Sequence, residues 1–159
     1  MLEMTQGEPG GARTKRHKLV LPAIAGSARQ ARQWVCSLSL RGTPHDLESV
    51  QLLVSELVTN SVRHSGLSPD DEFELHVQIE PGRVRVEVAD CGTGFDQRGR
   101  VQPSLDGGFG LFFVQEMSSR WGLDCDERTR VWFELDFGGH TAVPGENSGS
   151  TLNAPPAAV

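Results

Sequence analysis

The chain has 159 residues with 37% hydrophobic content, which is enough for one domain with a real core. Its net charge of −6 argues against a direct nucleic-acid partner, which would require a basic face. The sequence has no signal-peptide pattern, no apolar run of transmembrane length and three widely spaced cysteines, so we expect a reduced, cytoplasmic protein without a membrane partner.

Composition divides the chain into three parts. Residues 1–17 are polar and Gly-rich, and residues 138–159 consist mainly of small residues and proline. Neither segment can bury enough apolar surface to offset the entropy of ordering its backbone, so we expect both to be disordered tails. Residues 18–137 then form a single folded domain.

The folded part is predicted to begin with a strand and two helices. Residues 18–23 form a short edge strand that Pro22 ends. Ser27 is the predicted N-cap of a helix near 28–38, because apolar residues recur there at helical spacing.

The second helix has clear start and stop signals. Thr43 or Asp46 can cap its beginning, and it runs to about His64, where Ser65-Gly66 stops it. This helix is the longest predicted element of the chain.

A hairpin and a loop are predicted next. Residues 72–79 and 83–89 alternate apolar and polar side chains around the tight turn Glu80-Pro81-Gly82, which indicates a β-hairpin. Residues 95–107 are polar without a period and indicate a loop.

The chain then returns to a helix and two strands. A helix is predicted over 110–121 and is ended by Gly122, followed by a short strand near 122–126 and a clear strand over 130–137. The whole order predicts an α+β fold with helices layered on one mixed sheet.

The second helix carries the first candidate site residues. Its core face is formed by Val50, Leu53, Val54, Leu57 and Ser61. Glu56, Asn60 and Arg63 share a neighbouring arc, which His64 borders. An Asn oxygen suits Mg²⁺, and a Glu one turn away can accept a proton from an attacking hydroxyl. Taken alone, the pattern is also typical of a solvated helix face.

The strand over 83–89 leads into a second candidate motif. Asp90 ends the strand, where a partly buried carboxylate can accept a hydrogen bond from an exocyclic amine such as that of adenine. Gly92 and Gly94 let the backbone pass close to a flat ring. Alone, the motif equally fits a plain Asp-Gly turn.

A glycine-rich turn precedes the third helix. Gly107, Gly108 and Gly110 leave backbone N–H groups free to face an anion, which the helix dipole also favours, although a flexible loop has the same composition. The sequence contains neither a P-loop nor a dinucleotide-binding glycine pattern. The three motifs in this order therefore indicate an ATP site of another kind.

Together the motifs resemble those of a known superfamily. Residues 55–64 are similar to the N-box of the gyrase/Hsp90/histidine-kinase/MutL ATPases, residues 90–94 to its G1 box and residues 108–114 to its G2 box. The chain is most similar to the small stand-alone members, the bacterial anti-sigma factor serine kinases and related regulatory ATP-binding proteins of actinobacteria.

This resemblance implies a fold and a set of roles. The fold is a two-layer α/β sandwich, the Bergerat or histidine-kinase-like ATPase fold, whose mixed, mostly antiparallel sheet has helices on one face. ATP lies between the helices and the sheet, under a lid at about 95–107. Glu56 is the implied general base, Asn60 the Mg²⁺ ligand and Asp90 the partner of the adenine amine.

The remaining implied contacts surround the base and the phosphates. Gly92 and Gly94 border the base. The phosphates are bordered by Gly108, Phe109, Gly110 and Leu111. Arg63 and His64 are also candidates for phosphate contact, and a capping or packing role for His64 fits equally well.

Two features depart from the family pattern. A threonine near the start of the last strand usually supports the adenine site, but the register inferred from the sequence puts Arg130 there, with Thr129 one residue earlier as the remaining candidate. The lid carries only Arg98 and Arg100 as cations.

Two functions are compatible with these residues. The first is a protein serine/threonine kinase that phosphorylates an anti-anti-sigma (STAS) protein and also binds a sigma factor; a homodimer through the sheet fits the resemblance too. The second is a non-catalytic nucleotide-binding module. A sensor histidine kinase is not expected, because residues 1–26 cannot form its phosphoacceptor hairpin.

Overall fold

The computed structural model describes residues 14–92, 109–125 and 128–138. Its strands are β1 (Lys15–Pro22), β2 (Glu72–Glu80), β3 (Arg83–Asp90), β4 (Arg120–Cys125) and β5 (Thr129–Asp136), and its helices are α1 (Ser27–Ser37), α2 (Pro44–His64) and α3 (Phe109–Met117). This order of elements is the one that the sequence predicted. The loop over 95–107 and nearly all of both predicted tails lie outside the described residues, although β1 begins three residues before the expected edge strand.

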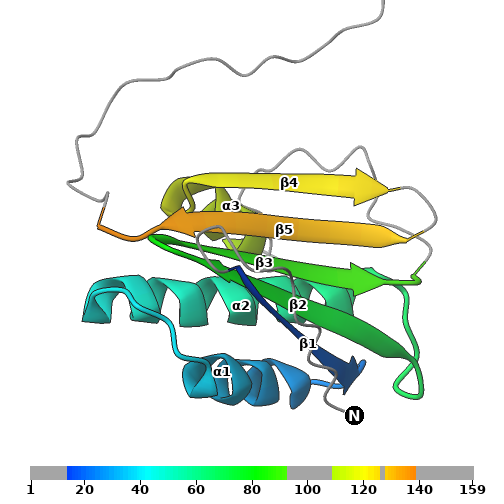
Figure 1. Ribbon diagram of the computed structural model, residues 1–159. Helices are drawn as coiled ribbons and strands as arrows, with labels where there is room; N and C mark the ends of the chain where they lie inside the picture. Colours follow the sequence, from blue (N-terminus) through cyan, green and yellow to red (C-terminus); the bar gives the residue numbers. More distant parts are fainter. Residues whose placement is uncertain (1–13, 93–108, 126–127, 139–159) are drawn as a thin grey trace, which may run out of the picture.

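The strands form one sheet in the order β1-β2-β3-β5-β4 (Figure 1). The predicted α+β fold is confirmed. Its sheet was expected to be mixed and mostly antiparallel, and all four pairings between described strands are antiparallel. The reason lies in the connections. The α3 crossover brings β4 back parallel to β3, but β5 folds back from β4 as a hairpin and lies between them.

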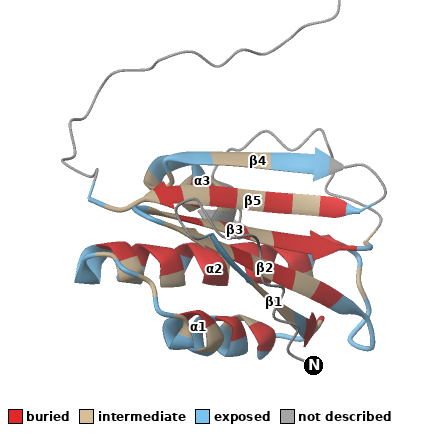
Figure 2. Ribbon diagram, in the orientation of Figure 1, coloured by how far each residue is buried: buried red, intermediate tan, exposed pale blue. Residues whose placement is uncertain are grey.

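The three helices cover one face of the sheet, and α2 packs between α1 and α3 (Figure 1). Figure 2 shows buried residues concentrated where α2 faces the strands. The strand residues on this inner face are Phe73, Leu75, Val77, Val84, Val86, Val88, Val131, Phe133 and Leu135, all buried. The core face predicted for the second helix is confirmed, since each of its five residues is buried.

The helix caps agree with the sequence in one case and differ in the other. At α2, Thr43 and Asp46 act together as a capping box rather than as alternatives. At α1 the N-cap is Gly26, and Ser27 is the first helical residue. The Ser27 hydroxyl does not cap the helix and instead donates to the carbonyl oxygen of Pro22 at 2.6 Å, because the end of β1 lies within hydrogen-bond distance of it.

The third helix is shorter than predicted. It ends at Met117, and Trp121 and Gly122 belong to β4. Gly122 is therefore not a helix stop. It lies opposite Trp132 in the β4–β5 pairing, and a Cβ at this position would lie 2.6 Å from the indole ring. Position 122 therefore has room only for a glycine beside the Trp132 ring on the neighbouring strand.

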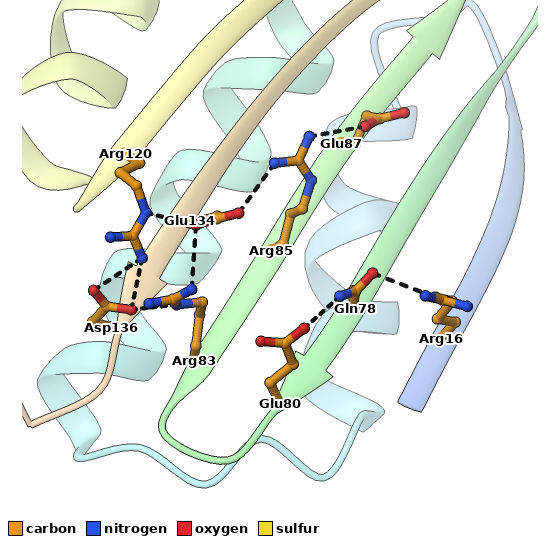
Figure 3. Close-up of polar contacts among 9 residues, drawn as sticks. All are labelled: Arg16, Gln78, Glu80, Arg83, Arg85, Glu87, Arg120, Glu134 and Asp136. Atoms are coloured by element: carbon orange, nitrogen blue, oxygen red, sulfur yellow. Dashed lines mark hydrogen bonds and ion pairs between the residues drawn. The ribbon is translucent and has the colours of Figure 1, made fainter. Parts of the chain in front are cut away.

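The outer face of the sheet is charged. Arg120 and Arg85 donate to Glu134 at 2.7 and 3.1 Å, and Arg83 pairs with Asp136 (Figure 3). The Arg85 guanidinium also lies 3.8 Å from the centroid of the Trp132 ring. These contacts join β3, β5 and β4 on the side away from the helices.

Among the described residues, no helix is both long and apolar enough to cross a membrane.

Candidate nucleotide site

The exit of β3 places a carboxylate in the interior. Asp90 is 2% exposed, and its partner on β5 is Thr129, which is 4% exposed. Arg130 lies on the alternate face of β5 and is half-buried. The register inferred from the sequence, with Arg130 at the adenine-side position, was therefore wrong, because β5 begins one residue earlier and its inward residues start at Thr129.

Both oxygens of Asp90 accept hydrogen bonds. The Ser61 hydroxyl, from α2, donates to Oδ2 at 2.6 Å, and the backbone N–H of Gly92 donates to Oδ1 at 3.1 Å. An ionised carboxylate has about four acceptor positions, so capacity remains for an exocyclic amine. The arrangement suits recognition of a donor group on a base.

The same helix presents the other predicted residues. Asn60 is 6% exposed, and its Nδ2 has no hydrogen-bond partner among the described residues. Glu56, one turn earlier, is half-buried, whereas Arg63 and His64 are exposed. The structure thus places Glu56 and Asn60 beside the buried face, and it leaves Arg63 and His64 at the solvent-facing end of α2.

Gly92 has a packing role within the protein. A Cβ here would collide with the carbonyl oxygen of Ser65, the C-cap of α2, and would lie 2.7 Å from the Ser65 Cβ. The strand exit and the end of α2 are therefore in close contact. Any side chain at position 92 would push the two elements apart.

The glycine-rich turn is only partly described. Gly94 and Gly108 lie outside the described residues, and Phe109 and Gly110 are the first residues of α3. Leu111, predicted to border the phosphates, is half-buried and packs against the core. The role of these residues toward a phosphate stays a prediction.

The sequence did not predict one buried contact of the candidate site, the hydrogen bond from Ser61 to Asp90. Ser61 was assigned to the core face of α2, but no role was given to its hydroxyl. The available signal was a serine within an otherwise aliphatic stripe, since a buried hydroxyl without a partner is costly. The partner, Asp90, could not be identified from spacing alone.

The donor set fits a nucleotide with Mg²⁺. Nδ2 of Asn60, which has no partner among the described residues, is a hydrogen-bond donor and suits a phosphate oxygen, and the amide oxygen of the same side chain could face a cation. Asn60 lies one turn from the half-buried carboxylate of Glu56 on the same helix. No group of three His, Cys, Asp or Glu residues gathers within the described ranges. A metal carried here would use Asn60 together with phosphate and water oxygens, which is the usual manner of Mg²⁺.

Comparison with known proteins agrees with this geometry. The histidine kinase-like ATPase domain matches residues 21–134, and the chain belongs to that family.

Its relatives include the serine-protein kinase RsbW of Listeria monocytogenes serotype 4a (strain HCC23), which is 32% identical over 98 residues. The RsbW of Listeria innocua serovar 6a is 31% identical over the same length. Each match covers 54% of this chain and 62% of the relative, so the chain spans about three fifths of these curated proteins.

A solved structure is also similar. It is the histidine kinase domain of the blue-light-activated histidine kinase EL346 from Erythrobacter litoralis, with 18% identity and a TM-score of 0.49. The match covers 74% of this chain and 62% of that chain.

Proposed function

We propose that this protein binds ATP with Mg²⁺ and transfers the γ-phosphoryl group to a serine or threonine of a partner protein. The observation that carries the proposal is the buried pair Asp90 and Thr129, linked by Ser61 to the helix that holds Glu56 and Asn60. In this proposal, base recognition and phosphate chemistry lie at two ends of one site, between α2 and the sheet.

The residues have distinct roles in this proposal. Asp90 accepts a hydrogen bond from the adenine amine, and Thr129 supports it from β5. Asn60 supplies an oxygen to the metal. Mg²⁺, when bound, neutralises charge on the phosphates.

Glu56 acts as the general base. It accepts the proton of the substrate hydroxyl while that oxygen forms a bond to the γ-phosphorus, and the bond to the β–γ bridging oxygen breaks to leave ADP. Little other covalent chemistry is required of the protein, so positioning by α2 and β3 accounts for most of the rate.

The name of the RsbW relatives, serine-protein kinase, supports phosphotransfer to serine. We propose a STAS-type anti-anti-sigma protein as the substrate and a sigma factor as a second partner. Phosphorylation would change partner choice by adding charge at the contact surface. Because ATP is the donor, we place this activity in the cytoplasm.

The test begins with binding. Calorimetric titration of the full chain with a non-hydrolysable ATP analogue, with and without Mg²⁺, should show metal-dependent affinity in the micromolar range, roughly −8 kcal/mol. Asp90→Asn should weaken ATP more than GTP, and Asp71→Asn, an exposed change in the loop before β2, is the matched control. An equal loss for both nucleotides would remove Asp90 from base recognition.

Phosphotransfer is tested separately. Incubation with γ-labelled ATP and a STAS protein should label the partner in wild type. Metal-dependent binding without any transfer would support the second function, a nucleotide-reading module that binds its partner without catalysis. No binding at nucleotide concentrations of about 1 mM would overturn both.

A further inference from the structure

We propose that Ser61 is a positioning residue for base recognition, and that it sets the preference of the site for a 6-amino over a 6-oxo purine. The inference rests on the proposed function, because it assumes that Asp90 meets the base. It concerns a residue to which neither the sequence motifs nor the family comparison gives a role.

Ser61 is a polar residue in an apolar environment. It is 2% exposed and shares the core face of α2 with Leu57, which is 1% exposed. A hydroxyl at this depth is stable only with a partner. Its partner is Asp90, 29 residues along the chain, at a donor–acceptor distance of 2.6 Å. The hydroxyl has a single hydrogen, so this bond uses its whole donor capacity.

The two hydrogen bonds to Asp90 fix its orientation. Oδ2 is bound from α2 by Ser61, and Oδ1 is bound by the N–H of Gly92 in the strand exit. Rotation of the carboxylate would break at least one of these bonds inside the protein, where replacement by water is restricted. One acceptor position remains on each oxygen of Asp90, and the direction of each is fixed by these two hydrogen bonds.

The fixed orientation of the Asp90 carboxylate decides which purine base can bind. An ionised carboxylate accepts hydrogen bonds and cannot donate one, so it pairs with an exocyclic amine and opposes a carbonyl oxygen. A carboxylate that can rotate would avoid this repulsion at small cost. Selectivity between amino and oxo purines thus depends on the groups that hold Asp90 in place.

Ser61 also connects the two halves of the site. Its chain neighbour Asn60 has a buried Nδ2 with no partner among the described residues, so consecutive residues of α2 would serve the phosphate side and the base side of the proposed site. The Ser65 hydroxyl donates to the backbone oxygen of Ser61 at 2.5 Å, and Ser65 packs against Gly92. The end of α2 and the exit of β3 are held together at these points.

The experiment compares ATP with ITP, which carries an oxo group in place of the 6-amine. Dissociation constants for both are measured by calorimetry with the full chain and Mg²⁺. Wild type should prefer ATP by roughly 100-fold or more. A site built to accept a hydrogen bond from the 6-amine of the ligand rejects a ligand that lacks this amine. Ser61→Ala should reduce that ratio by about tenfold, the loss expected for one hydrogen bond to a charged group.

Ser55→Ala is the matched control. Ser55 is a buried serine of the same helix, 7% exposed. Its hydroxyl donates to the backbone oxygen of Gln51 and accepts from Arg32 at 3.3 Å, and it makes no hydrogen bond to Asp90. Its ATP/ITP ratio should equal that of wild type. Ser61→Thr, which keeps the hydroxyl, should retain most of the preference.

Partial unfolding of a variant does not change the ratio of its ATP and ITP dissociation constants, because it weakens the apparent affinity for both nucleotides by the same factor. In the Asp90→Asn background, Ser61→Ala should have no further effect on this ratio. A ratio within twofold of wild type in Ser61→Ala, or an equal weakening of both nucleotides, would overturn the inference while leaving ATP binding intact. Failure of wild type to bind either nucleotide would overturn the proposed function as well.

Discussion

Asp90 and Thr129 lie directly opposite one another at the ends of β3 and β5, and both side chains are buried on the helix side of the sheet. Their neighbour Arg130 lies on the other face. The alternation of side chains along a strand thus assigns the threonine, and not the arginine, to the interior.

Thr129→Val should therefore weaken ATP binding by roughly three- to tenfold, since it removes one hydroxyl from the wall beside Asp90 and nearly keeps the volume. Calorimetry with the ATP analogue measures the change. Arg130→Ala is the control on the opposite face and should bind normally. A larger loss in Arg130→Ala than in Thr129→Val would contradict the assignment to the adenine side.

Glu56→Gln should separate binding from catalysis. The substitution keeps the size of the side chain and removes its ability to accept a proton, so nucleotide affinity should stay within about twofold of wild type while phosphotransfer falls by roughly 10²–10⁴-fold. Single-turnover transfer from labelled ATP to the partner protein is the measurement. Unchanged transfer would exclude Glu56 as the general base.

Asn60→Ala should have opposite effects on binding and on stability. Loss of the amide oxygen should abolish the effect of Mg²⁺ on nucleotide affinity. Because Nδ2 of Asn60 is buried with no partner in the part of the chain that the structure describes, its removal should leave the nucleotide-free protein as stable as wild type, or more stable by up to about 1 kcal/mol. Calorimetry and urea unfolding give the two readouts. Strong destabilisation together with normal Mg²⁺ dependence would indicate a structural amide.

Gly92→Ala should destabilise the fold. The added methyl group meets the backbone of Ser65, which cannot move without displacing the end of α2, so we expect a loss of roughly 3 kcal/mol or more in the free energy of unfolding. Gly26→Ala is the control, because a Cβ there has no neighbour within 4 Å. Similar unfolding midpoints for the two variants would show that the close approach of β3 and α2 is relaxed in solution.

Glu74 gives the fold a pH dependence. Lys18 donates to it at 2.9 Å, and this hydrogen bond, with smaller contributions from His76 and Arg128, lowers the pKa of Glu74 from 4.5 to about 2 against the opposing effect of burial. A carboxyl whose pKa is lower in the folded state stabilises the protein above its unfolded pKa. That contribution is lost as the pH falls from about 4.5 toward about 2.

Glu74→Gln should therefore flatten the acid side of the stability curve. We expect the variant to lose on the order of 1–2 kcal/mol less than wild type between neutral pH and pH ~2, after allowance for solvent screening of partly exposed partners. Urea unfolding across this range measures it. Glu72→Gln, at the exposed start of the same strand, should follow wild type. Parallel curves for all three proteins would contradict the role of Glu74.

Much of the fold could be predicted because the signals are local. The core face of α2 and the place of its N-terminal cap depend on residues within one or two helical turns, and the β2–β3 hairpin depends on a short turn between two adjacent strands. The errors have a different origin. The missed start of β4 at Arg120 and the role of Gly122 depend on Trp132, which belongs to another strand.

The sequence by itself therefore determined the order of elements and the candidate residues on each, because periodicity, caps and turns are properties of near neighbours. The tertiary structure decided which of those residues meet. The pairing of β3 with β5 set Thr129 against Asp90, and the packing of α2 on the sheet brought the Ser61 hydroxyl to the same carboxylate. Both contacts join segments far apart in the chain, and neither spacing nor composition specifies the distance between such segments.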